Sequence, residues 1–198
     1  MLPLFLAGCA DGWASAPVPP IIINEVMADP SRVPDETGEW FEVHNRGAAA
    51  VSLRGWKIAS RNDAAHTIAS AVTVPAGGYV VLARSRMAGA EYVYGNALNL
   101  ANGADHLVLR DAAGARVDSV AWTSVPAGAS RGVMDPAAEH ASLGGANWRS
   151  STTPFGAGDR GTPGKRNDGY VQAPAPRAPA PATSAPPPPA GGRHRSWL

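Results

Sequence analysis

The chain has 198 residues, a formal net charge of +1 and only 17% charged residues, so it lacks the global positive field that would hold a polyanion. Its 22 glycines and 19 prolines exclude a helical bundle, because both residues break helix interiors. A single cysteine excludes an internal disulfide framework and a cysteine-rich zinc site.

Residues 1–19 are predicted to be a short signal and a linker outside the folded domain. An apolar run from Leu2 to Leu6 precedes Ala7-Gly8-Cys9, and small residues ahead of a cleavage point are typical of a secretory signal. Leu6-Ala7-Gly8-Cys9 resembles the bacterial lipobox, in which the cysteine becomes the diacylated N-terminus. This resemblance implies an extracytoplasmic lipoprotein of the bacterial envelope, anchored to the membrane through Cys9. A chance cysteine in a ragged chain end is the alternative.

Between residues 21 and 121 the hydrophobic pattern has a period of two, and short apolar runs are bounded by Gly, Pro, Asn or Asp. This spacing predicts an all-β sandwich or barrel. In chain order, strands are expected at residues 21–28, 39–45, 51–60, 66–69, 79–83, 91–94, 106–110 and 116–122. Residues 123–169 are expected to be loop-like, with Trp148 and Phe155 as anchors against the sandwich.

Alternation within these strands predicts which side chains share a face. In residues 39–45, Phe41 and Val43 are expected on one face, and Trp40, Glu42 and His44 on the other. Glu25 is expected on the face of Ile21, Ile23 and Met27, with a partly buried carboxylate. Gly55 is expected to form a β-bulge in residues 51–60. The hairpin 106–122 is expected to supply core through Leu107, Leu109, Val117 and Val120.

The C-terminal segment is predicted to be a disordered tail. Residues 171–198 contain eight prolines, and such a segment cannot bury enough apolar surface to offset its ordering entropy. We therefore expect a Pro/Ala-rich tail over residues 169–198, with an extended, polyproline II character. The folded domain is expected between residues 20 and 168.

Seven segments between residues 20 and 168 together resemble the bacterial lamin-tail domain. They are Ile-Ile-Asn-Glu-Val-Met-Ala-Asp-Pro (22–30), Gly-Glu-Trp-Phe-Glu-Val-His-Asn (38–45), Val-Ser-Leu-Arg-Gly-Trp-Lys-Ile (51–58), Pro-Ala-Gly-Gly-Tyr-Val-Val-Leu (75–82), Leu-Asn-Leu-Ala-Asn-Gly-Ala-Asp-His-Leu-Val-Leu (98–109), Val-Asp-Ser-Val-Ala-Trp (117–122) and Gly-Asp-Arg-Gly-Thr-Pro-Gly-Lys-Arg-Asn (158–167). The resulting structural motif residues are Trp40, Phe41, Gly55, Trp56, Asn102, Gly103, Asp159, Arg160, Gly161, Pro163 and Gly164.

The resemblance implies an immunoglobulin-like β-sandwich with no catalytic activity of its own and no agreed catalytic residues. Related domains of animal lamins bind proteins and nucleic acid, and bacterial copies are often appended to secreted nucleases or phosphatases. Fold alone does not fix function.

Two short motifs are expected to be structural. Residues 128–132 match G-x-S-x-G, but that nucleophile pattern needs a strand-to-helix turn, and no helix-forming run follows. Residues 156–161 match G-x-G-x-x-G, but Thr162-Pro163-Gly164 prevents the helix that a dinucleotide site requires. Asp159 is expected to pair with Arg160 or another nearby donor.

Acidic residues concentrate near the start of the domain, where six fall within 18 residues: Glu25, Asp29, Asp35, Glu36, Glu39 and Glu42. Strand-borne carboxylates around an Asp-rich loop could ligate Ca²⁺, and the candidate ligands are Glu25, Asp29, Glu39 and Glu42, although their spacing fits no named calcium loop. The alternative is a solvated acidic loop in which Glu25 or Glu42 bonds to backbone or to arginine.

Other chemistry-bearing residues are expected to have structural roles. The histidines His44, His66 and His106 are expected at the surface or at sheet edges. The tryptophans are expected in the core rather than on a carbohydrate platform; they are Trp40, Trp56, Trp122 and Trp148. The arginines are not concentrated in one stretch, which disfavours a nucleic-acid site.

Three functions follow, in order of preference. The first is a non-catalytic binding or structural module of the bacterial envelope, without a cofactor, which contacts an unidentified envelope protein or polymer. The second is an accessory module of a secreted nuclease or phosphatase system, which binds nucleic acid or a divalent cation. The third is a metal-dependent hydrolase that uses the acidic residues.

Overall fold

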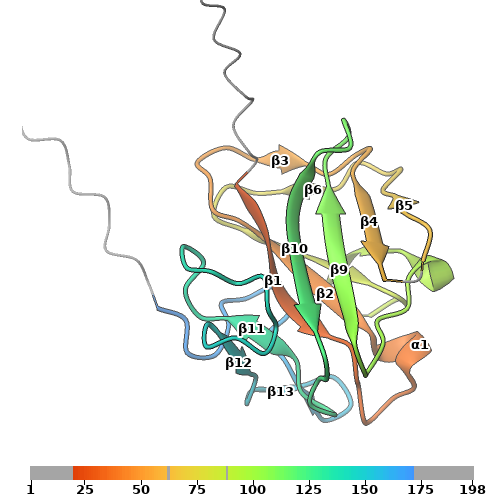
Figure 1. Cartoon of the computed structure of the whole chain (residues 1–198), viewed down its shortest axis with the longest axis vertical. Coiled ribbons are helices and arrows are strands. Elements are labelled where there is room, and N and C mark those ends of the chain that lie inside the picture. The colour runs from red at the N-terminus through yellow and green to blue at the C-terminus, as the bar shows by residue number, and fades with distance from the viewer. Residues whose placement is uncertain (1–19, 62, 88, 172–198) are drawn as a thin grey trace, which may run out of the picture.

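The computed structural model describes residues 20–61, 63–87 and 89–171, in which two main β-sheets pack against each other (Figure 1) and two further sheets have two strands each. Helical turns are limited to α1 (Asp35–Gly38) and the 3-10 turn η1 (Gly95–Ala97), and no helix in these ranges is long and apolar enough to cross a membrane. The strands are β1 (Ile21–Met27), β2 (Trp40–Asn45), β3 (Val51–Ser52), β4 (Lys57–Ser60), β5 (His66–Thr67), β6 (Thr73–Val74), β7 (Tyr79–Ala83), β8 (Ala90–Val93), β9 (Asp105–Arg110), β10 (Arg116–Trp122), β11 (Arg131–Val133), β12 (Trp148–Ser150), β13 (Pro154–Phe155) and β14 (Asp159–Arg160).

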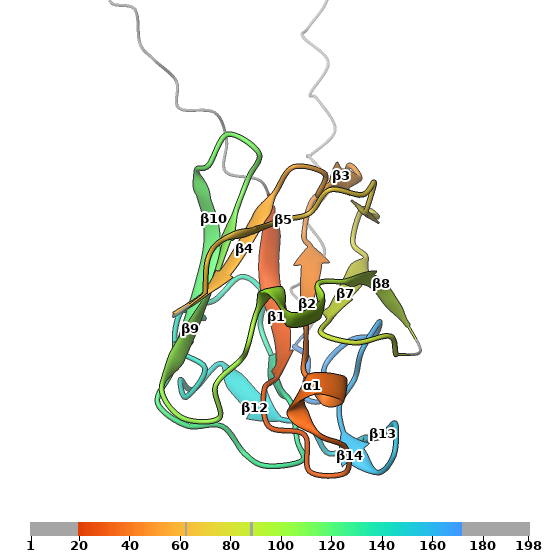
Figure 2. The same ribbon diagram turned by 90° about the vertical axis from the view of Figure 1, so that its right-hand side faces the viewer.

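The two main sheets differ in size. The large sheet has the order β12-β11-β1-β2-β7-β8, and the small sheet has the order β10-β9-β4-β5, while the two further sheets are β3-β6 and β13-β14. Pairing is antiparallel except between β7 and β8. Figure 2 views the sandwich from its side, with β9 and β10 to the left of β1 and β2. The predicted all-β sandwich is therefore confirmed.

The core lies between the sheets and follows the predicted alternation. Phe41 and Val43 of β2 are fully buried there, and Leu107 and Leu109 of β9 meet them from the small sheet. Val120 is buried in the same core, and Val117 packs against it partly buried. Three of the four tryptophans predicted to be core residues are also in this cluster, namely Trp56, Trp122 and Trp148. Each buried aromatic side chain removes about 150 to 250 Å² from water, so these residues dominate the stability.

The outer face of the large sheet is covered by the C-terminal segment, residues 151–170. Side chains two residues apart along a strand point the same way, so every second residue of β2 and β7 lies on this face. These side chains and the outward-facing side chains of β1 form three zones. An apolar zone holds Met27, Trp40 and Ala83, where Phe155 packs edge-on to Trp40. A polar zone holds Glu25 and Glu42, which lie opposite each other in the β1–β2 register. A third zone holds His44 and Tyr79, which lie opposite each other in the β2–β7 register.

The prediction for the face of Glu25 is wrong. A register shift between Ile23 and Glu25 interrupts the β1–β2 pairing, so strict alternation fails at this point. Ile21 and Ile23 face the core between the sheets, while Glu25 faces outward with Met27. Glu25 is nevertheless completely buried, at 0% exposure, because the C-terminal segment covers it.

Gly55 forms a reverse turn rather than a bulge. Its φ of +81° lies in the left-handed region, which glycine adopts without steric cost. The Trp56 amide donates to the Leu53 carbonyl across this turn. The turn divides the predicted strand 51–60 in two, so β3 pairs with β6 while β4 joins the small sheet.

Residues 123–169 contain β11 to β14, which correct the expectation of a loop. β11 pairs with β1, and β12 pairs with β11, so together they extend the large sheet beyond β1. These strands are two or three residues long, too short to show a period of two. The packed chain also passes the predicted boundary at residue 168, because the Val171 amide donates to the Met134 carbonyl at 2.8 Å.

Candidate functional site

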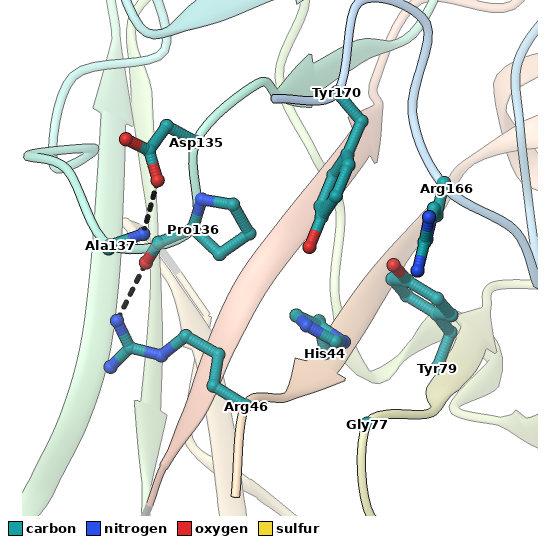
Figure 3. A pocket seen from close by; sticks show the side chains of 9 residues that line it. All are labelled: His44, Arg46, Gly77, Tyr79, Asp135, Pro136, Ala137, Arg166 and Tyr170. Atoms are coloured by element: carbon teal, nitrogen blue, oxygen red, sulfur yellow. Dashed lines mark hydrogen bonds between the residues drawn. The ribbon is translucent and has the colours of Figure 1, made fainter. Parts of the chain in front are cut away.

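A cleft of about 320 Å³ lies at the end of the outer face where β2 ends and β7 begins (Figure 3). We call it the arginine–tyrosine cleft. Four separate parts of the chain contribute its walls: the end of β2, the start of β7, the loop after β11 and the C-terminal segment. The lining residues are His44, Arg46, Gly77, Tyr79, Asp135, Pro136, Ala137, Arg166 and Tyr170.

His44 and Tyr79 form the floor of the cleft. Their rings stack with centroids 4.4 Å apart and planes 19° apart. His44 Nδ1 lies 3.0 Å from the Gly78 carbonyl oxygen, and a carbonyl can only accept, so Nδ1 carries the hydrogen. When the ring is neutral, Nε2 is therefore a hydrogen-bond acceptor. The expectation of a surface or sheet-edge His44 is wrong, since its exposure is 6%.

Two arginines stand at opposite sides of the cleft (Figure 3). Arg46 donates from Nη1 to the Pro136 carbonyl at 2.6 Å, which holds it against the loop after β11. The Arg166 guanidinium lies 5.0 Å from the centroid of the Tyr170 ring, a cation–π contact. Both side chains are thus positioned by contacts within the fold.

The electrostatics of the cleft favour an anion. Burial lowers the pKa of His44; its hydrogen bond to Gly78 opposes this effect, and the charges of Arg46 and Arg166 add to the lowering. Burial also raises the pKa of Tyr79 to about 12, so both floor residues are neutral at pH 7. Of the described residues that line the cleft, Asp135 alone is acidic, and its Oδ1 already accepts from the Ala137 amide.

A buried polar network lies beside the cleft on the outer face. Glu25 accepts hydrogen bonds from the Ser130 and Ser151 hydroxyls and from both the amide and the hydroxyl of Thr162. Glu42 accepts from the Asn24 side chain and from the Gly164 amide. Burial raises the pKa of both carboxyls, and the charge of Glu25 further raises that of Glu42. We define the network by Asn24, Glu25, Glu42, Ser130, Ser151, Thr162, Gly164 and Asn167.

The structure does not bring the four predicted metal ligands together. Glu25 and Glu42 share the network, whereas Glu39 bonds to Arg84 at 3.0 Å and accepts from the Leu100 amide. Asp29 accepts from the Asn102 side chain at 3.2 Å. Within residues 20–61, 63–87 and 89–171, no three His, Cys, Asp or Glu side chains are grouped so that they could hold a metal ion.

A protein-family model described as Lamin Tail Domain matches residues 14–124. This match covers more than half of the chain. The chain belongs to the lamin tail domain family. The immunoglobulin-like β-sandwich implied by the resemblance is therefore confirmed. A search of curated proteins finds no match to the chain.

Residues 158–167, the last of the seven segments of this lamin tail domain, supply part of the buried polar network. Lys165 donates its amide to the Thr162 carbonyl, and Gly164 has a φ of +75°, as in a type II turn with Pro163 and Gly164 at its centre. The turn aims the Gly164 amide at Glu42. Gly161 must stay small, because a Cβ there would lie 2.9 Å from the Trp40 ring.

Asp159 and Arg160 are not partners of each other through their side chains in this lamin tail domain. Asp159 accepts instead from the Ser31 amide and hydroxyl and from the Arg32 amide, which ties β14 to the loop after β1. Arg160 contributes its backbone, whose carbonyl accepts from the Ser130 amide. The predicted structural role of this motif holds, with different donors.

Other predicted motif residues have distinct positions. Trp40 is fully buried, and its Nε1 has no hydrogen-bond partner among the described residues. Asn102 also lies 3.3 Å from Asp35, whereas Gly103 is in open space. Ser130 of the G-x-S-x-G match is fully buried and bonded to Glu25. Cys9 lies outside the described residues.

The sequence reasoning missed the arginine–tyrosine cleft. Arg46, Asp135 and Arg166 are far apart along the chain, and the arginines show no local clustering. One signal was present, because alternation placed His44 on the face opposite the core. The position of that face under the C-terminal segment was not predictable from alternation.

Proposed function

We propose that this lamin tail domain is a non-catalytic binding module of the bacterial cell envelope, with the arginine–tyrosine cleft as its recognition site. The observation that carries the proposal is the convergence of two arginines and three aromatic or imidazole rings from four chain segments at one cleft. Convergent polar groups in a concave site are the usual marks of a ligand site. Arginine and tyrosine are also the residue types enriched at recognition surfaces.

Contacts of the acidic residues support binding rather than catalysis. Glu25 and Glu42 are held in the buried polar network, and Glu39 pairs with Arg84. Each carboxylate therefore has a structural role within the fold. Lamin tail domains are structural immunoglobulin-like domains, which agrees with this assignment.

The proposed location rests on the chain ends. Leu6-Ala7-Gly8-Cys9 resembles a lipobox, and two acyl chains on Cys9 would hold the protein stably at a membrane. The linker between Cys9 and β1 contains Pro17, Pro19 and Pro20, and a proline-containing linker of this kind would act as a semi-rigid spacer. In this arrangement the domain stands off the membrane and presents the cleft to an envelope protein or polymer.

The binding role predicts that the full chain carrying Cys9→Ser co-sediments with isolated bacterial envelope fragments. Arg46→Ala and Arg166→Ala should each weaken this binding at least about tenfold, because each removes a charge-assisted donor from the cleft. Arg54→Ala is the matched control, since Arg54 is exposed in the turn after β3 and does not line the cleft. Equal binding by all four proteins would contradict the assignment of the cleft. Metal-dependent phosphoester cleavage that Glu39→Gln abolishes would contradict the non-catalytic role.

The anchoring role predicts that a clickable fatty acid labels the protein in cells. The label should appear on the chain with its natural Cys9 and should be absent from Cys9→Ser, because the thiol is the acylation point of a lipobox. Expression uses the complete native leader, and immunoblotting confirms equal amounts of both proteins. Equal labelling of both would show that the lipid is attached elsewhere.

A further inference from the structure

The arginine–tyrosine cleft presents positive charge from two opposing walls. Arg46 is fixed by the Pro136 carbonyl, and Arg166 lies over the Tyr170 ring. A guanidinium has five N–H donors, and the bond to Pro136 uses one of those on Arg46. Two guanidinium groups held in place before a ligand arrives lower the ordering cost of binding.

We infer that this cleft binds the phosphate group of a small polyol phosphate or sugar phosphate unit, an inference that rests on the proposed binding function and names its ligand. The presence of two arginines in the lining of one cleft favours phosphate over carboxylate. A planar carboxylate matches a single guanidinium fork, whereas a tetrahedral phosphate has enough acceptor oxygens to bond with two guanidinium groups at once. Figure 3 shows Arg46 and Arg166 on different sides of the cleft, with the Arg46 guanidinium turned towards the Pro136 carbonyl.

The remaining polar groups suit the hydroxyl part of such a ligand. The hydrogen of His44 is committed to Gly78, so the neutral ring offers an acceptor at Nε2. Asp135 offers further carboxylate lone pairs beside its bond from Ala137. A ligand hydroxyl can donate to either acceptor, and the Tyr79 hydroxyl can donate in return. The cleft thus combines donors for phosphate oxygens with acceptors for hydroxyl groups.

The size of the cleft matches a ligand of one polyol phosphate or sugar phosphate unit. Its volume of about 320 Å³ is at the low end of the roughly 300 to 1,000 Å³ of ligand pockets. Proteins that bind nucleic acid neutralise several phosphates along a basic groove. Two arginines around one small cleft match one phosphate rather than a tract, so nucleic acid is the competing outcome of the test.

Titration of the full chain carrying Cys9→Ser with glycerol 3-phosphate tests the inference. Amide NMR shifts and calorimetry should report saturable binding with a dissociation constant of about 1 mM or below. Arg46→Ala and Arg166→Ala should weaken it at least about tenfold, and Arg54→Ala should leave it unchanged. Arg166→Lys keeps the charge but loses the planar fork, so its affinity should fall between those of wild type and Arg166→Ala. Circular dichroism confirms that each variant is folded.

Further probes distinguish the ligand classes. Inorganic phosphate should compete more weakly than glycerol 3-phosphate, and glycerol alone should not bind. Competition by phosphatidylglycerol vesicles would identify a lipid headgroup as the source of the phosphate, and its absence would identify a soluble or polymer-borne unit. Absent binding of glycerol 3-phosphate, equal binding of sulfate, or tighter binding of oligothymidylate would each overturn the inference.

The outcomes separate this inference from the proposed function. If envelope fragments bind through Arg46 and Arg166 but glycerol 3-phosphate neither binds nor competes, the phosphate assignment fails and the binding module stands. If glycerol 3-phosphate binds but envelope fragments do not, the envelope role fails and the chemistry of the cleft stands.

Discussion

Replacing Phe41 with alanine should lower the free energy of unfolding by about 3 to 5 kcal/mol, as large-to-small aromatic substitutions in a core do. Phe41 is completely buried at the centre of the large sheet, opposite Val26 on β1 and Leu82 on β7. Its ring also stacks on Tyr94, with centroids 6.0 Å apart. The substitution leaves a cavity between two sheets that cannot both move inward. Urea unfolding followed by circular dichroism measures the loss.

Two further variants serve as comparisons for the loss of stability in Phe41→Ala. Phe41→Leu keeps most of the volume and should cost less than Phe41→Ala. Val93→Ala on the edge strand β8 is the surface control, because Val93 is 44% exposed; it should change stability by less than about 0.5 kcal/mol. A loss below about 1 kcal/mol in Phe41→Ala would show that this ring does not support the core.

Stability should fall as the pH rises from about 4.5 towards 7. Burial is the main cause that raises the pKa of Glu39 from 4.5 to about 7, and it also raises the pKa values of Glu25 and Glu42. In this window the folded state binds more protons than the unfolded state, so each unit of pH removes stability. For Glu39 the expected loss is about 1 to 3 kcal/mol, since solvent screening reduces the full value of the shift.

Other titrating groups modify this profile without reversing it. The hydrogen bond to Asp118 raises the pKa of His140 in the folded state. The stability that His140 contributes is therefore also lost as the pH rises through this raised pKa. The pKa values of His44 and Asp168 are lowered, and their contributions are lost as the pH falls. Three carboxyls with exposures of 1% or less act in one direction and these two groups act in the other, so the profile keeps its sign.

Thermal unfolding between pH 4.5 and 8 measures the profile. The wild type should melt at its highest temperature in the acid part of this range. Glu42→Gln removes one titrating carboxyl from the buried polar network and should flatten the profile, whereas Glu36→Gln should not, because Glu36 is exposed on α1. A melting temperature that rises steadily from pH 4.5 to 8 would contradict the assignment of these carboxyls.

The sequence predicted the parts of the fold that depend on local alternation. β7 and β10 begin and end where expected, because turn residues bound each of them clearly. The two faces of β2 were also predicted correctly, with Phe41 in the main core and Trp40 in the apolar zone outside.

Prediction failed where backbone irregularity or distant pairing decides the structure. The register shift in β1 moved Glu25 to the other face, and alternation contains no signal for such a shift. Strands β11 and β12 are held by their neighbours rather than by their own pattern, since Gly132 pairs with Glu25 and with Arg149. The cleft depends on the same distant pairing, which brings Asp135 and Arg166 to the cleft that Arg46 also lines.

Residues 151–170 cover the outer face of the large sheet, and they lie beyond residue 124, where the match to the family model ends. The folded unit is therefore longer than the matched segment. A fragment ending at residue 124 would lack β11, and the backbone of β1 on that side would become an open sheet edge, a template for pairing with other chains. It would also uncover Met27 and Trp40 together with the carboxyls of Glu25 and Glu42, all of which are nearly inaccessible in the longer chain. A fragment that keeps the outer face covered therefore has to continue to about residue 171, where the Val171 amide donates to the Met134 carbonyl.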